Sequence, residues 1–166
     1  QGTVGLEILA QCPELDAVVV PVSGGGLIGG VPTAVKALAP RVRVFGAEPA
    51  ALPRYTESLR AGHPVQVEQK RSVADALVAQ IPGNICFPYV AANTDGFAPV
   101  ADDDILRGMK LLLLDGKLLC EPSSAIGIGA VLRGQLPVHK GDKVCFVISG
   151  GSVALEQLHR LEDVRL

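Results

Sequence analysis

The chain has 166 residues, of which 48% are hydrophobic and 19% charged, and its formal net charge is -2. This profile suits one globular domain with a buried core, and it offers no basic field for nucleic acid or anionic lipid. No apolar run approaches the roughly 20 residues that a membrane-spanning helix needs, so no membrane association is expected.

The first 49 residues predict a short helix followed by a strand–helix–strand unit. Ala17–Val22 is almost uniformly apolar and β-branched, which is typical of a strand buried on both faces of a parallel sheet. The crossover between the two strands is expected to be right-handed. The predicted elements are a helix from Thr3 to about Cys12, a strand at Ala17–Val22, a helix at Leu27–Leu38 and a strand at Val42–Ala47.

The rest of the chain predicts mainly helix. The acidic run Asp102–Asp104 complements the positive end of a helix dipole, and Lys143–Ile148 has the apolar character of a third buried strand. Gly62–Ser72 is predicted to be a loop, and Ile81–Gly96 has no clear pattern. Helices are predicted at Leu52–Ala61, Asp102–Leu114, Ala125–Leu132 and Val153–Leu161. The expected fold class is α/β, with a mostly parallel twisted sheet flanked by helices.

The cysteines contain no Cys-x-x-Cys pair and stand mostly among apolar neighbours. We interpret them as buried reduced thiols of a cytoplasmic protein. No metal centre can be built from the cysteines and histidines by spacing. The residues concerned are Cys12, Cys86, Cys120, Cys145, His63, His139 and His159.

Two glycine-rich turns follow predicted strands, and turns at the carboxyl ends of parallel strands gather in one crevice. Ser23–Gly26 can expose successive backbone N–H groups at the positive end of the next helix, which suits an anion such as phosphate. The alternative is a close crossing of helix and sheet that needs small residues. Ser149–Gly151 follows the last strand, and taken alone its serine is a helix cap. The first turn lacks the dinucleotide and P-loop patterns, which disfavours NAD and ATP sites of those classes.

Five motifs then carry a resemblance. They are Pro21–Leu27, Gly46–Pro49, Val73–Ala76, Glu121–Ala125 and Ser149–Gly151. In order and spacing they resemble serine racemase and the serine/threonine dehydratases, which are fold-type II pyridoxal-phosphate (PLP) enzymes. The resemblance extends over nearly the whole chain. It implies PLP-dependent ammonia-lyase or racemase chemistry on serine or threonine, in which the α-proton is removed and water is eliminated from the β-carbon. Whole enzymes of this family are often homodimers.

The resemblance also implies roles for individual residues. The PLP phosphate would be held by Ser23, Gly24, Gly25, Gly26 and Leu27. Ser149 would hydrogen-bond the pyridine nitrogen, and Glu121 is either a carboxylate near the cofactor or an acid that begins a helix. Some family members bind Mg²⁺ or Ca²⁺ through a glutamate, a backbone carbonyl and an aspartate. Here those positions are Glu48, Leu52 and Arg54, and Arg54 argues against the usual site because it could pair with Glu48.

The family supplies its Schiff-base lysine from an N-terminal half, in a Ser-x-Lys-x-Arg type segment. No lysine of this chain stands in such a context; the lysines are Lys36, Lys70, Lys110, Lys117, Lys140 and Lys143. Residues 1–166 are therefore expected to be the C-terminal part of a PLP-binding catalytic domain that is inactive by itself, so no catalytic residue is assigned here. The alternative is a truncated, non-catalytic homologue that keeps the phosphate-binding loop.

Overall fold

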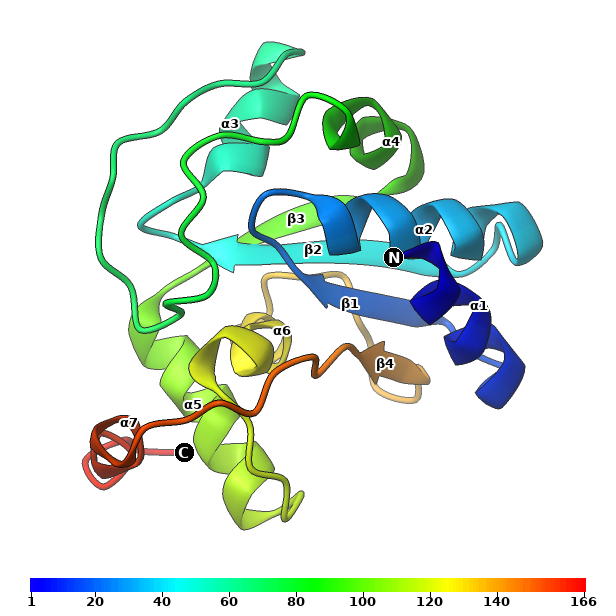
Figure 1. The fold of residues 1–166 in the computed structure, drawn as a ribbon. Coiled ribbons are helices and arrows are strands. Elements are labelled where there is room, and N and C mark those ends of the chain that lie inside the picture. The colour runs from blue at the N-terminus through cyan, green and yellow to red at the C-terminus, as the bar shows by residue number, and fades with distance from the viewer.

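A four-stranded parallel sheet in the order β3-β2-β1-β4 forms the centre of the computed structural model, which describes residues 1–166 (Figure 1). The central strand β1 pairs with β2 over its whole length and with β4 over its first three residues. The strands are β1 (Ala17–Pro21), β2 (Arg43–Pro49), β3 (Gly96–Val100) and β4 (Val144–Phe146). Since all pairs are parallel, the loops that leave β1, β2 and β4 lie at the same end of the sheet.

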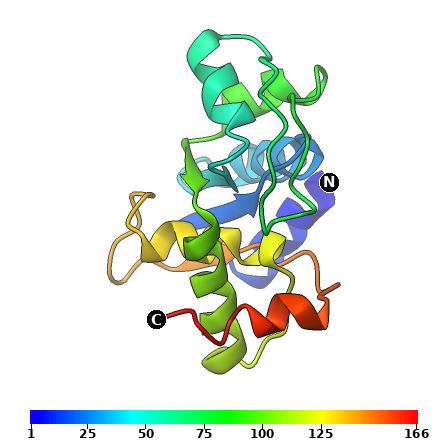
Figure 2. The ribbon, with the colours of Figure 1, turned by 90° about the vertical axis from the view of Figure 1, so that its left-hand side faces the viewer.

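Helices cover both faces of the sheet, so that the molecule has three layers (Figures 1 and 2). One face carries α1 to α4 and the other carries α5 and α6, with α7 beside α5 near the C-terminus (Figure 1). The helices are α1 (Gly2–Gln11), α2 (Gly26–Leu38), α3 (Arg54–Ala61), α4 (Cys86–Asn93), α5 (Asp102–Leu114), α6 (Pro122–Leu132) and α7 (Leu155–His159). None of them is long and apolar enough to cross a membrane.

The side chains of β1 alternate between two cores. Val18 and Val20, with Val22 just after the strand, pack with α2, α3 and α4 on one face, whereas Ala17 and Val19 pack with α5 and α6 on the other. Successive side chains of a strand point to opposite faces, so a strand buried on both sides must be apolar throughout. The uniform apolar run therefore predicts β1 correctly, and the expected α/β fold with a parallel sheet is confirmed.

The structure differs from the predicted elements in three places. The unassigned segment Ile81–Gly96 contains α4, and β3 follows it. Local sequence hides both, because α4 contains a proline and β3 is an edge strand with a glycine and a proline. The last predicted strand forms only three residues, because its pairing with β1 ends at Val19 and the next N–H donor position on β1 is Pro21, which has no N–H group. The last helix is shorter than predicted and begins at Leu155.

The expectation that the cysteines are buried is wrong for three of the four. All four are free thiols, but only Cys120 is buried, Cys86 and Cys145 are half-buried, and Cys12 is exposed. Cys12 lies just after α1, a helix that covers the edge of one core and packs against it only through partly buried side chains such as Val4, Ile8 and Leu9. Burial raises the pKa of Cys120 to about 11.

Candidate functional site

The loop between β1 and α2 presents a row of unused backbone donors. None of the N–H groups of residues 23 to 28 donates a hydrogen bond to a protein acceptor. The first N–H groups of any helix lack intrahelical partners, and the three loop residues before α2 extend that row. Together with the positive end of the α2 dipole, these donors form a site suited to an anion.

The three glycines of this loop differ in what they require. Gly25 has a left-handed φ of 114°, and a Cβ there would lie 1.9 Å from the Tyr55 hydroxyl oxygen, so both conformation and packing demand glycine. A Cβ on Gly24 or Gly26 would meet no atom within 4 Å. The fold itself does not need glycine at these two positions, but an additional group bound beside the loop would need that space.

The second glycine loop reaches the same place. A cavity of about 140 Å³ lies between the β1–α2 loop and Ser149, which is exposed to solvent. The parallel topology thus brings together the two turns that the sequence singled out. The cavity contains no charged side chain; its lining residues are Pro21, Ser23, Gly24, Gly25, Gly26, Leu27, Ile28, Leu77 and Ser149.

Glu121 lies behind the second loop and does not line the cavity. Its carboxyl group contacts Gly150, where a Cβ would come within 2.4 Å of the carboxyl carbon, and its backbone N–H donates to the Gly150 carbonyl over 3.2 Å. The Ser124 hydroxyl accepts the N–H of Gly150 over 2.8 Å. Glu121 also immediately precedes α6. The start of α6 therefore fixes the turn that carries Ser149.

Arg54 does not pair with Glu48, which corrects the sequence-based expectation. The Glu48 carboxylate accepts the backbone N–H groups of Tyr55 and Thr56 and the Thr56 hydroxyl, at 2.9, 2.8 and 2.7 Å. The Arg54 guanidinium instead donates to the carbonyl oxygens of Val22, Ser23 and Leu77. Burial raises the pKa of Glu48 and lowers the pKa of Arg54, and both side chains are inaccessible to solvent.

These contacts do not fit a divalent cation at Glu48. Its oxygens already accept three hydrogen bonds, and the nearby buried guanidinium supplies a positive charge where a cation would need a third oxygen ligand. Nor does the structure contain any group of three or more His, Cys, Asp or Glu side chains arranged to hold a metal ion.

Sequence reasoning missed the side chains behind the first loop. Tyr55 donates its hydroxyl to the Gly24 carbonyl over 3.1 Å, and the backbone N–H of Gly83 donates to the same oxygen over 2.8 Å. Burial raises the pKa of Tyr55, so the hydroxyl keeps the proton that it donates. Arg54 and Tyr55 are 31 or 32 residues distant in the sequence from the loop carbonyls that accept their hydrogen bonds, those of Val22, Ser23 and Gly24, and no local pattern signals these contacts.

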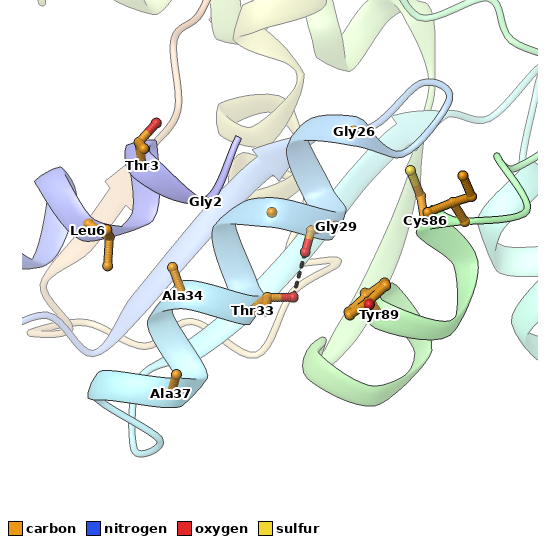
Figure 3. Close-up of a pocket in the computed structure, with 12 residues that line it drawn as sticks. Gly2, Thr3, Leu6, Gly26, Gly29, Thr33, Ala34, Ala37, Cys86 and Tyr89 are labelled. Carbon is orange, nitrogen blue, oxygen red and sulfur yellow. Dashed lines mark hydrogen bonds between the residues drawn. The ribbon is translucent and has the colours of Figure 1, made fainter.

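The largest cavity, of about 630 Å³, is a separate apolar groove between α1, α2 and α4 (Figure 3). Leu6, Ala34, Ala37 and Tyr89 point toward it. The Thr33 hydroxyl donates back to the Gly29 carbonyl over 2.7 Å and is not free for a ligand. The groove has no charged side chain, and its polar side chains are the hydroxyls of Thr3, Thr33 and Tyr89 and the thiol of Cys86.

Comparison with known proteins agrees with this arrangement. A family described as "Pyridoxal-phosphate dependent enzyme" matches residues 1–150. The chain is 40% identical to the L-threonine ammonia-lyase of Thermotoga maritima over 97% of this chain, and 38% identical to a serine racemase of Oryza sativa subsp. indica over 93%. The structure of maize serine racemase superposes with a TM-score of 0.88 at 38% identity, over 96% of this chain and 49% of the maize protein. Threonine deaminase isoform 2 of Solanum lycopersicum gives a TM-score of 0.91 at 32% identity, over 98% of this chain and 45% of that protein.

The chain spans about half or less of the length of these relatives. It covers 40% of the Thermotoga maritima protein and 47% of the rice protein. The family match nevertheless includes the first glycine loop, Ser149 and Gly150 of the second, and the sheet that positions them. The chain therefore belongs to the family of pyridoxal-phosphate dependent enzymes and has the architecture of their fold type II members.

Proposed function

We propose that this chain is the cofactor-binding part of a PLP-dependent lyase or racemase that acts on a hydroxy amino acid such as serine or threonine. The observation that carries the proposal is the row of six unpartnered N–H groups at residues 23 to 28, beside Ser149 in one cavity. The names of the relatives, L-threonine ammonia-lyase and serine racemase, support the reaction class. Phenylserine dehydratase of Ralstonia pickettii, 37% identical over 149 residues, adds a third hydroxy amino acid.

In this proposal the β1–α2 loop binds the phosphate of PLP. Its N–H groups donate to the phosphate oxygens, and the α2 dipole favours the negative charge. The missing side chains of Gly24 and Gly26 leave room for the phosphate to approach the amides. No carboxylate lines the cavity to repel it.

Ser149 is proposed to hydrogen-bond the pyridine nitrogen at the other end of the cofactor. When bound, PLP supplies an electron-withdrawing ring that makes the α-proton of an amino acid acidic enough to remove. A carboxylate at this position would keep the ring nitrogen protonated, whereas the Ser149 hydroxyl leaves it largely neutral. The Ser149 hydroxyl would therefore suit a cofactor that withdraws electrons less strongly, as needed where a β-hydroxyl would be lost soon after the α-proton. Glu121 acts indirectly by holding the Gly150 turn.

The lysines favour a second candidate, a PLP-binding protein without catalysis. Each lysine is absent from the cavity lining, and Lys36, Lys110 and Lys143 are held elsewhere by partners. A lysine is needed both to form the Schiff base and to carry the α-proton. In the enzyme that we propose, that lysine belongs to a segment outside these 166 residues. Reading the DNA upstream in frame separates the candidates. A lysine-bearing half would support the enzyme, and expression of the whole frame should then yield 2-oxo acid from serine or threonine.

Cofactor binding itself is tested by equilibrium dialysis of PLP against this chain in an amine-free buffer. The Gly24→Ala variant should fold as the wild type does, because its Cβ meets no protein atom, yet bind PLP more weakly because the methyl group occupies the phosphate space. Gly29→Ala is the matched control, since Gly29 lies in the first turns of α2, outside the cavity, and its Cβ would make only ordinary contacts. Equal PLP affinity in wild type and Gly24→Ala would overturn the proposed site.

A further inference from the structure

Three consecutive carbonyl groups of the β1–α2 loop are held from one side. Arg54 donates to the oxygens of Val22 and Ser23 over 2.8 and 3.3 Å, and Tyr55 donates to the oxygen of Gly24 over 3.1 Å. Arg54 and Tyr55 are the first two residues of α3 and are fully buried. Neither lines the cavity of the site. The two side chains therefore contact the loop from behind.

The direction of these carbonyls determines the direction of the loop's donors. In a planar trans peptide unit the C=O and the N–H point in opposite directions. No peptide bond of this chain is cis. With the carbonyls of residues 22, 23 and 24 turned toward α3, the N–H groups of Ser23, Gly24 and Gly25 must point away from it. These three N–H groups have no protein acceptor, and the three residues that carry them line the cavity, whereas Arg54 and Tyr55 do not.

The Arg54 guanidinium also links the loop to a second segment. Its Nη2 donates to the Leu77 carbonyl over 2.7 Å, and Leu77 lines the cavity from the long connection between α3 and α4. Its Nε has no partner although it is buried. A buried, incompletely satisfied charge is costly to a fold, so a role beyond packing accounts better for Arg54 than packing alone. Its positive charge also lies directly behind the donors that face an anion.

We propose that Arg54 and Tyr55 are positioning residues of the phosphate site, which turn three successive peptide units so that their N–H groups converge on the bound phosphate. The proposal rests on the function proposed above. Glu48 contributes to this positioning because its carboxylate accepts hydrogen bonds from the backbone N–H groups of Tyr55 and Thr56 and so fixes the start of α3. In this view α3 sets the geometry of the site without touching the ligand.

The test compares Tyr55→Phe with Tyr89→Phe, its matched control on the exposed surface of α4. Tyr55→Phe removes only one hydroxyl, and the Gly83 N–H still binds the Gly24 carbonyl, so the fold should persist. PLP affinity, measured by dialysis, should fall about threefold to tenfold in Tyr55→Phe, as expected for one lost orienting hydrogen bond, and stay unchanged in Tyr89→Phe. Arg54→Lys should lose more, because an ammonium group cannot reproduce the planar fork that serves three carbonyls.

The second readout is the set of backbone amide chemical shifts, followed by NMR while the protein is titrated with inorganic phosphate alone. In the wild type the Ser23, Gly24 and Gly25 signals should shift on adding phosphate, and these shifts should shrink in Tyr55→Phe and Arg54→Lys. Arg60→Lys, an exposed position on the same helix, should behave as the wild type. If wild type binds PLP and Tyr55→Phe binds it equally with the same phosphate shifts, the positioning role is refuted while the proposed function stands. If wild type binds neither PLP nor phosphate, the proposed function itself fails.

Discussion

The Glu48 carboxylate accepts the backbone N–H of Tyr55 over 2.9 Å and thereby joins the end of β2 to the first turn of α3. An acid at a helix N-terminus satisfies N–H groups that have no partner within the helix. This hydrogen bond also affects the loop after β1, because Arg54 and Tyr55 at the start of α3 donate hydrogen bonds to the carbonyl groups of that loop. Glu48 thus serves as an internal helix anchor in this chain.

Stability should depend on pH through Glu48. Burial raises the pKa of this carboxyl above its ordinary value of 4.5, so the folded chain binds the proton more tightly than the unfolded chain does. The associated stabilisation is complete below pH 4.5 and is lost as the pH rises through the folded-state pKa. Glu48→Gln cannot titrate. The unfolding free energy of wild type relative to Glu48→Gln, measured with urea, should therefore fall from pH 4 to pH 7 (about the range in which a raised carboxyl titrates).

The control for this series is Glu57→Gln, which removes one carboxylate from a half-exposed position on the same helix and leaves the hydrogen bonds from Tyr55 and Thr56 to Glu48 in place. If the unfolding free energy of wild type instead rises relative to that of Glu48→Gln as the pH rises, the hydrogen bonds from Tyr55 and Thr56 outweigh the cost of burying the charge.

Divalent cations should not stabilise this chain. Glu48 is saturated by the start of α3, and Arg54 supplies the neighbouring positive charge, so Mg²⁺ or Ca²⁺ has no vacant ligand set to bind. We expect the same thermal midpoint in EDTA and in excess of either cation. A midpoint that rises with cation concentration would reveal binding to the folded state and contradict this account.

Gly25→Ala should destabilise the fold by about 1–3 kcal/mol, the usual cost of a strained backbone conformation, with a further penalty from the clash with Tyr55. Gly24→Ala, one residue away, should stay within about 0.5 kcal/mol of wild type because its Cβ is unobstructed. Urea denaturation of the two variants measures this contrast. Similar losses of unfolding free energy in both variants would mean that the whole loop is intolerant of side chains, and not only Gly25 with its left-handed conformation.

Incubation of this chain with PLP followed by borohydride reduction should leave every lysine unmodified at low PLP concentration. The reason is that no lysine lines the cavity beside the β1–α2 loop and Ser149. Peptide mass spectrometry identifies any reduced pyridoxyl adduct. A stoichiometric adduct on one lysine would contradict the view that the Schiff-base lysine lies outside these residues.

Thiol reactivity should separate the cysteines. Exposed Cys12 should react with iodoacetamide in the native state, whereas Cys120 should be protected by burial and by a pKa raised to about 11. Mass spectrometry of the timed reaction, repeated in urea, provides the comparison. Rapid native labelling of Cys120 would show that the contact between α5 and α6 opens readily.

Much of the fold and of the candidate site could be predicted from the sequence. The run of β-branched residues before Ser23 identified β1, because a strand buried on both faces has no polar position. Parallel topology then placed Ser23–Gly26 and Ser149 together, since loops that leave parallel strands share one end of the sheet. By contrast, α4 and β3 escaped prediction because proline and glycine weaken their local signals, and tertiary contacts stabilise them: α4 packs on α2, and β3 pairs with β2.

By itself the sequence determined the β1–α2 loop, its glycines and its order relative to Ser149, all of which depend on neighbouring residues. Only the tertiary structure decided where the charge of Arg54 goes. Sequence proximity suggested Glu48 as its partner, but Glu48 is occupied by α3 and the guanidinium reaches Val22 and Leu77 instead. Such a contact joins segments 23 to 32 residues apart. It arises because α3 folds back over the end of β1, where the carbonyl oxygens of Val22, Ser23 and Leu77 accept hydrogen bonds from the buried guanidinium.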